Sequence, residues 1–245
     1  MDIRCLSESL TENLLRGSSS AKTARARARE RPSPRRHISP PPPGWRHSSP
    51  SVEANAFDAS DLRIEMAKGK AKAAPRARPN VLITGTPGTG KSSLAERVAA
   101  AAGMTQYDVS ATAKAENMVE EYDEEMDTHV IDEDAVLDHM EERLGTNDGG
   151  FVVDYHSCDL FPERWFDLVV VLTCDNSTLY DRLEARGYKA SKITKNVECE
   201  IFQAVVEEAR ESYAEEIVRV CPSNDIEEME LNEKHVVEWI AAWGK

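Results

Sequence analysis

The chain has 245 residues, of which 40% are hydrophobic and 30% charged, and its formal net charge is −14. No stretch approaches the roughly 20 consecutive apolar residues of a membrane-spanning helix, and no apolar signal-peptide region follows Met1. The five cysteines are widely spaced and form no CxxC pair, which argues against a zinc site or a redox dithiol. These features exclude fibrous and membrane-spanning classes and predict a soluble intracellular protein with one globular core.

Residues 1–78 are predicted to form a disordered basic extension. They are rich in Pro, Ser and Arg, and residues 1–79 hold 16 basic and 8 acidic side chains, a net charge of +8. Such a composition buries too little apolar surface to offset chain entropy. Four interpretations stay open: a nuclear-localisation or nucleic-acid-binding arm, an organelle transit peptide, a solvated tail, or a segment upstream of a mature protein starting at Met66.

Residues 79–245 alternate between short β-type runs and helical periodicity, and residues 80–245 carry a net charge of −22. We expect strands over 81–84, 107–109, 151–154, 168–173 and 217–220. We expect helices over 92–102, 133–144, 176–186, 194–216 and 233–243. Strand alternating with helix favours parallel βαβ units covered by helices on both faces. The sequence therefore predicts one doubly wound α/β domain.

The strongest motif is GTPGTGKS, which begins at Gly85, fits G-x-x-x-x-G-K-[ST], and lies between an apolar strand and a helix. Glycines in such a loop allow backbone N–H groups to surround an anionic oxygen at the start of a helix. Lys91 supplies a positive charge for the β- and γ-phosphates, and the Ser92 hydroxyl suits Mg²⁺. The motif predicts binding of ATP or a similar triphosphate with Mg²⁺ by Gly88, Thr89, Gly90, Lys91, Ser92 and Ser93.

Asp154 ends the apolar run FVVD, where P-loop proteins place a carboxylate that holds Mg²⁺. Asp154 and Ser92 therefore form the predicted metal site. His156 lies two residues later and would share a face with Asp154 in an extended strand. From the residues alone, His156 either orients the attacking water or acceptor hydroxyl, or is a hydrogen-bonded loop histidine.

A group of cations follows the fourth predicted strand, and Gly187 is predicted to end the helix that carries the first of them. The group consists of Arg182, Arg186, Lys189, Lys192 and Lys195. Its later members lie on a segment that could close over the nucleotide, where an arginine can stabilise charge on the transferring phosphoryl group. The alternative is that these cations only complement the dipole at the helix C-terminus.

The chain closely resembles the adenylate kinase isoenzyme 6 family, also called the coilin-interacting nuclear ATPase, across residues 79–245. The similar segments are GTPGTGKS, YDEEMDTHVIDED, VDYHSCDLFPERWFD, LEARGY and NVECEIFQ. The resemblance implies a P-loop nucleoside-monophosphate-kinase fold with a five-stranded parallel sheet flanked by helices. It also implies a monophosphate-binding insert over 108–131 and a short lid over 185–195.

The resemblance further implies an adenylate kinase that converts ATP and AMP into two molecules of ADP, with an ATPase activity. It implies a role in small ribosomal subunit maturation (late 18S rRNA processing), in nucleus and cytoplasm, with a basic small-subunit ribosomal protein and the pre-ribosomal particle as partners. Nothing in the chain demands a dimer, so we expect a monomer. The implied catalytic residues are Lys91, Asp154, His156 and Arg186, and Arg186 would also contact ATP.

The predicted insert departs from the family pattern and is strongly acidic. Lys114 stands where the family usually has an arginine, which binds phosphate with better geometry. The stretch from Glu116 to Asp134 holds ten carboxylates and no Lys or Arg. Such a field repels a dianionic monophosphate and attracts a basic partner, unless the carboxylates form only a solvated face.

Two functions stay open from the sequence. One is a monophosphate kinase; the other is mainly an ATPase switch that binds a basic ribosomal protein and has little physiological kinase activity. A nucleic-acid-binding protein that uses the basic extension is less favoured, because the folded part is so acidic.

Overall fold

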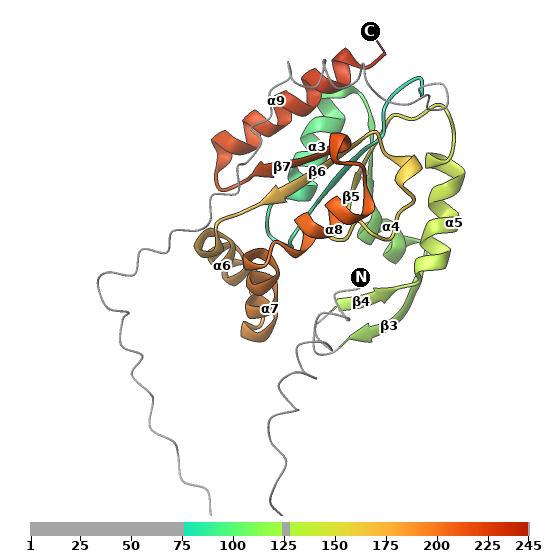
Figure 1. Cartoon of the computed structure of the whole chain (residues 1–245). Coiled ribbons are helices and arrows are strands. Elements are labelled where there is room, and N and C mark those ends of the chain that lie inside the picture. The colour runs from blue at the N-terminus through green and yellow to red at the C-terminus, as the bar shows by residue number, and fades with distance from the viewer. Residues whose placement is uncertain (1–75, 124–127, 245) are drawn as a thin grey trace, which may run out of the picture. The chain divides into compact units, whose positions relative to one another are not determined.

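The computed structural model describes residues 76–123 and 128–244 (Figure 1). The extension predicted over 1–78 lies outside the described residues except for its last three. None of the helices within the described ranges is long and apolar enough to cross a membrane.

The main elements alternate between strand and helix up to α4, and two successive strands, β3 and β4, follow. In chain order they are β1 (Val81–Gly85), α3 (Lys91–Ala102), β2 (Thr105–Asp108), α4 (Val109–Ala115), β3 (Val119–Asp123), β4 (Thr128–Ile131), α5 (Glu133–Leu144), β5 (Phe151–Asp154), β6 (Leu168–Thr173), α6 (Asn176–Ala185), α7 (Ala190–Ile201), α8 (Ala204–Ser212), β7 (Val218–Pro222) and α9 (Ile226–Ala242). Short 3-10 turns lie at Glu163–Trp165 and Glu215–Ile217.

The strands β2, β5, β1, β6 and β7 form a five-stranded parallel sheet in that order. Successive residues of β1 point to opposite faces: Val81 and Ile83 pack in a cluster with α3 and α9, whereas Leu82 packs in a cluster with α5 and α8. Figure 1 shows α3 and α9 together on one side of the sheet. These layers confirm the predicted α/β fold with a parallel sheet flanked by helices.

The predicted helix over 194–216 is wrong as a single element. It is two helices, α7 and α8, separated at Gln203, whose φ of 51° lies in the left-handed region. In a continuous helix, Val205 and Val206 would lie about 140° and 240° around the axis from Glu200. All three residues are buried, so the chain must change direction between them.

Residues 108–131, predicted as the monophosphate-binding insert, form α4 and an antiparallel β3–β4 hairpin in their described parts. The predicted strand over 107–109 instead spans Thr105–Asp108, and the Asp108 carboxylate accepts a hydrogen bond from the Ala111 amide (2.8 Å). This cap starts α4. The hairpin was not predicted, because its many carboxylates disfavour a strand assignment.

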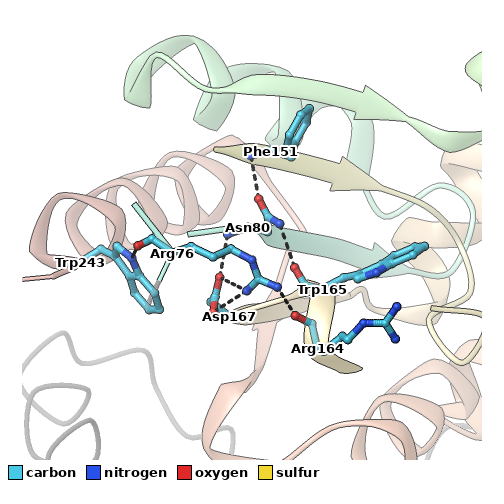
Figure 2. A network of polar contacts seen from close by, with 7 residues as sticks. All are labelled: Arg76, Asn80, Phe151, Arg164, Trp165, Asp167 and Trp243. Carbon is cyan, nitrogen blue, oxygen red and sulfur yellow. Dashed lines mark hydrogen bonds and ion pairs between the residues drawn. The ribbon is translucent and has the colours of Figure 1, made fainter. Parts of the chain in front are cut away.

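The first described residues are tied into the sheet at the end opposite the phosphate loop. The Arg76 guanidinium contacts both Asp167 carboxylate oxygens at 3.0 Å and the Arg164 carbonyl, and the Arg76 carbonyl accepts from the Trp243 indole (3.1 Å) (Figure 2). The boundary predicted at residue 79 therefore falls three residues inside this network. The N-terminal and C-terminal ends of the domain are thus joined.

Asn80 lies at the centre of this network and is fully buried. Its side chain donates to the Trp165 carbonyl (3.0 Å) and accepts from the Phe151 amide (3.2 Å) (Figure 2). These bonds join the residue before β1 to the start of β5 and to the 3-10 turn that precedes β6. Asn80 therefore aligns the edge of the sheet that lies far from the site.

We expect Asn80→Ala to lower the free energy of unfolding by about 2–3 kcal/mol, because it leaves a buried amide and a buried carbonyl unpaired. Urea denaturation of the full chain would measure the change, with the exposed Asn147→Ala as control. The affinity for ATP should stay unchanged in both variants. A loss below about 0.5 kcal/mol would show that water or neighbouring groups replace the lost bonds.

Candidate functional site

The phosphate loop connects β1 to α3 at the carboxyl edge of the sheet. Gly88 and Gly90 have φ values of 103° and 98°, a region that side chains other than glycine rarely adopt. A Cβ at Gly88 would lie 2.8 Å from the Leu179 side chain, and one at Gly90 would lie 2.6 Å from the Met229 side chain. The loop therefore needs both glycines, and it presents backbone N–H groups at a helix start, where anions bind.

Lys91 is held against this loop by a backbone carbonyl of the loop itself. Its ammonium group donates to the Thr86 carbonyl at 3.1 Å. The pKa of Lys91 is lowered to about 8, mainly by burial; Asp154 opposes this shift and the Arg186 charge contributes to it. A phosphate at this position would place a further negative charge beside the partly desolvated ammonium and stabilise its charged form.

Asp154 ends β5 beside the phosphate loop and is 4% exposed. Burial raises the pKa of Asp154, the Asp108 charge raises it further, and a hydrogen bond from Ser92 opposes the shift. Gln106 approaches the same carboxylate at 3.5 Å. The structure therefore brings together Ser92 and Asp154, the two residues predicted to hold a metal.

The donor set at this place fits Mg²⁺. A hydroxyl and a carboxylate are hard oxygen ligands, and Mg²⁺ usually takes one or two such groups together with substrate phosphates and water. Within residues 76–123 and 128–244, no cluster of three or more His, Cys, Asp or Glu side chains could form a closed metal cage. Ser92 and Asp154 would therefore hold Mg²⁺ together with a phosphate.

A cavity of about 220 Å³ joins these groups. Its lining contains most of the predicted site residues: Gly88, Gly90, Lys91, Ser92, Ser93, Asp154, His156 and Arg186. Thr89 does not line it, because its buried hydroxyl donates to the Thr86 carbonyl (2.9 Å). Thr89 therefore shapes the loop, and any contact it makes with a nucleotide must come from its backbone.

Sequence reasoning missed several residues of the cavity wall. Asp108 lines it, and it faces Asp154 across the pairing of β2 with β5. The carboxylate at the end of the expected second strand was the available signal, because strand ends meet at one edge of a parallel sheet. The other residues missed are Pro87, Ser110 and Tyr155.

His156 lies in the loop after β5, with its ring centroid 4.2 Å from that of Tyr155. Burial lowers the pKa of His156 from 6.5 to about 4, and the Lys91 charge contributes in the same direction. The imidazole is therefore neutral at pH 7. In that form one ring nitrogen donates and the other accepts, which suits a group that orients an acceptor or a water.

The lowered pKa of His156 predicts a pH dependence of stability. As pH falls from 7 to 5, the unfolded chain gains a proton on this imidazole and the folded chain does not, so the folded state is destabilised by about 1–2 kcal/mol. His156→Asn should lose that much less stability over the same interval. Urea denaturation at both pH values would measure it, with the exposed His129→Asn as control; identical pH slopes for wild type and His156→Asn would contradict the assignment.

The predicted cationic group divides into two parts. Arg182 donates to the carbonyls of Ser223 (2.8 Å) and Asn224 (2.7 Å) in the loop after β7. It is therefore part of the fixed frame beside the phosphate loop and not of the lid. Arg186 lines the cavity, and Lys192 at the start of α7 lies 4.6 Å from the centroid of the Tyr188 ring.

Comparison with known proteins identifies the family. The AAA domain model matches residues 81–203. The adenylate kinase isoenzyme 6 homolog of Caenorhabditis elegans is 53% identical over 163 residues, which cover 66% of this chain and 90% of that protein. The corresponding homolog of Drosophila melanogaster is 47% identical over 169 residues, covering 69% of this chain and 95% of that protein.

Among solved structures, shikimate kinase from Acinetobacter baumannii in complex with shikimate is similar in fold alone. Its TM-score is 0.50 at 13% identity, and the match covers 69% of this chain and 97% of that one. Together with the phosphate loop and the parallel sheet, the curated relatives leave no doubt about the class. This chain belongs to the adenylate kinase isoenzyme 6 family of P-loop nucleotide kinases.

Proposed function

We propose that this protein is an ATP- and Mg²⁺-dependent adenylate kinase, converting ATP and AMP into two molecules of ADP, and that it also hydrolyses ATP. The observation that carries the proposal is the single cavity in which Lys91, Ser92, Asp154, His156 and Arg186 converge. Lys91 and Arg186 would neutralise charge on the transferring phosphoryl group. His156, neutral at pH 7, would orient the acceptor or a water.

The residues of the cavity also indicate how the nucleotide and the metal ion would be positioned for the reaction. The backbone of the phosphate loop and Lys91 would hold the β- and γ-phosphates at the start of α3. Ser92 and Asp154 would hold Mg²⁺, which would supply further charge neutralisation when bound. Asp154 would orient that ion from the rigid end of β5, so positioning and electrostatics supply most of the rate enhancement.

We further propose that the protein acts in small ribosomal subunit maturation, in late 18S rRNA processing, in the nucleus and cytoplasm. The proposed partners are a basic small-subunit ribosomal protein and the pre-ribosomal particle. Support comes from the acidic surface near the hairpin, where Glu116, Glu120 and Glu121 are exposed. Such a surface attracts a basic polypeptide.

A second candidate is an ATPase switch with little physiological kinase activity. Lys114, which stands where the family usually has an arginine, is exposed on α4 and does not line the cavity. The cavity wall on that side instead carries Asp108. A carboxylate there disfavours a dianionic acceptor and leaves water as the alternative acceptor.

Turnover of ATP distinguishes the two candidates. The purified full chain is incubated with ATP and Mg²⁺, alone, with AMP, or with a Lys- and Arg-rich peptide, and ADP and phosphate are followed separately. ADP formation that AMP stimulates well beyond the rate of phosphate release supports the kinase. Phosphate release that the peptide stimulates and AMP does not supports the switch, and absence of both reactions would overturn the proposal.

Charge reversal tests the proposed partner surface. We expect Glu116→Lys/Glu120→Lys to weaken binding of the basic peptide by about tenfold or more at low salt, because opposite charges become like charges. Fluorescence anisotropy with labelled peptide would measure the affinity, and ATP affinity should not change. The control of equal net charge is Glu215→Lys/Glu238→Lys, at two exposed acidic positions outside the hairpin. Equal losses of peptide affinity in the two double variants would show that the attraction is non-specific and would contradict the proposed partner surface.

A further inference from the structure

A buried carboxylate on α7 accepts a hydrogen bond from the phosphate loop. Glu200 is 8% exposed. One of its oxygens accepts from the Thr86 hydroxyl (2.5 Å), and the other accepts from the Cys174 backbone amide just after β6 (2.7 Å). Glu200 thereby joins the loops that follow two neighbouring strands of the sheet.

Thr86 passes this restraint on to the reacting end of the site. Its carbonyl accepts from the Lys91 ammonium (3.1 Å) and from the Thr89 amide (3.2 Å). A buried carboxylate is costly to desolvate, and no ion pair to Glu200 is found in the part of the chain that the structure describes. Its two hydrogen bonds therefore have to be kept, which fixes the position of Thr86.

A second carboxylate, on α8, holds the loop that carries His156. One oxygen of Glu208 accepts from the backbone amides of Cys158 (2.5 Å) and Asp159 (3.2 Å). The carbonyl of Cys158 accepts from the Tyr213 hydroxyl (2.7 Å). Cys158 is two residues beyond His156, so α8 and Tyr213, the residue that follows it, restrain this loop through both the N–H and the C=O of one residue.

We propose that Glu200 and Glu208 are positioning residues with separate tasks: Glu200 sets the phosphate loop, and Glu208 sets the His156 loop. The two carboxylates lie on either side of the left-handed residue Gln203, so the change of direction there lets α7 contact one loop and α8 the other. The inference rests on the proposed use of ATP as phosphoryl donor. It goes beyond that use because neither carboxylate lines the cavity.

Replacement of each glutamate by glutamine separates the two tasks. Glu200→Gln keeps the size of the side chain. It removes the negative charge and leaves only one of the two oxygens that accept from Thr86 and Cys174. We expect about tenfold weaker binding of a non-hydrolysable ATP analogue, measured by calorimetry with Mg²⁺. Glu208→Gln should bind the analogue within about twofold of wild type and lower turnover at saturating ATP by about tenfold. Glu198→Gln, exposed on α7, is the matched control.

Substitutions of Thr86 test the Thr86–Glu200 hydrogen bond from its other side. Thr86→Val removes the hydroxyl and should weaken analogue binding as Glu200→Gln does, whereas Thr86→Ser keeps the donor and should restore affinity. The double variant Thr86→Val/Glu200→Gln should bind the ATP analogue no more weakly than either single variant does, because both substitutions remove the same hydrogen bond. Urea denaturation of each variant shows whether the protein is folded under assay conditions.

The outcomes separate this inference from the proposed function. Glu200→Gln and Glu208→Gln could each lose affinity and turnover in equal proportion to their loss of stability. That result would show that both glutamates have only a structural role, and it would overturn the inference. So would two variants that behave like Glu198→Gln while wild type binds the analogue. A wild-type protein that does not bind the analogue would instead overturn the proposed function itself.

Discussion

Replacing Lys91 with methionine is expected to lower ATP turnover by about 10²–10³-fold, the loss seen when one preorganised electrostatic group is removed from a site. Methionine preserves the apolar stem but cannot contact phosphate. In the described structure the ammonium donates to the Thr86 carbonyl and is partly buried, and desolvation lowers the pKa of Lys91 to about 8. Its removal therefore relieves a desolvation cost in the free protein and removes attraction for the phosphates of the nucleotide.

Two measurements check this prediction. Steady-state turnover with ATP and Mg²⁺ gives the loss of rate, and urea denaturation should show equal or greater stability for Lys91→Met than for wild type. Lys234→Met, an exposed position on α9, is the control and should change neither quantity. Turnover of Lys91→Met within fivefold of wild type would contradict the placement of Lys91 at the reacting phosphates.

Asp154→Asn is expected to make the protein more stable and nearly inactive. Burial and the neighbouring Asp108 raise the pKa of Asp154, so the charged carboxylate costs the folded state free energy at neutral pH. Asparagine is neutral and can still accept the hydrogen bond from Ser92. We expect the free energy of unfolding to rise by about 1 kcal/mol at pH 7.

The sign of the pH dependence follows from the same shift. As pH falls through the raised pKa of Asp154, the wild-type carboxyl takes up a proton and its penalty disappears. The advantage of Asp154→Asn should therefore be largest at neutral pH and shrink on acidification. Urea denaturation at pH 7 and pH 4 would measure this, with the exposed Asp138→Asn on α5 as control.

The activity of Asp154→Asn should fall by about 10²-fold or more, since a neutral amide is a poor ligand for Mg²⁺. The dependence of the remaining turnover on Mg²⁺ concentration should shift to higher values. Retained activity with an unchanged Mg²⁺ dependence would contradict the assignment of Asp154 as a metal-holding residue. A gain in stability without loss of activity would show that Asp154 is only a strained structural residue.

Local sequence signals were enough for the sheet and the phosphate loop. The strands β1, β5 and β6 appear in the sequence as short apolar runs, and the loop appears as glycines at set distances from a lysine and a serine. Both patterns depend on neighbours in sequence, so no tertiary contact is needed to find them. Asp154 was predictable for the same reason, because a carboxylate that ends an apolar strand reaches the carboxyl edge of the sheet.

Contacts between distant residues decided what could not be predicted. Residues 194–216 show helical periodicity, yet the buried Glu200 and Val205 cannot share one face of a helix, and the chain bends at Gln203. The β3–β4 hairpin has a sequence dominated by charge. In the sequence, Arg182 is one of five cations near the predicted lid. The structure shows that its guanidinium instead donates to two carbonyls of the loop after β7.

By itself the sequence determined the fold class and the family, and it pointed to the residues proposed here to hold phosphate and Mg²⁺, because each of these depends on short segments of sequence. Only the tertiary structure decided how the site is held in place. Thr86 and Glu200 are 114 residues apart, and Asn80 and Trp165 are 85 apart. No local pattern encodes such pairs, since a buried glutamate and an exposed one look alike in sequence until packing removes one of them from water.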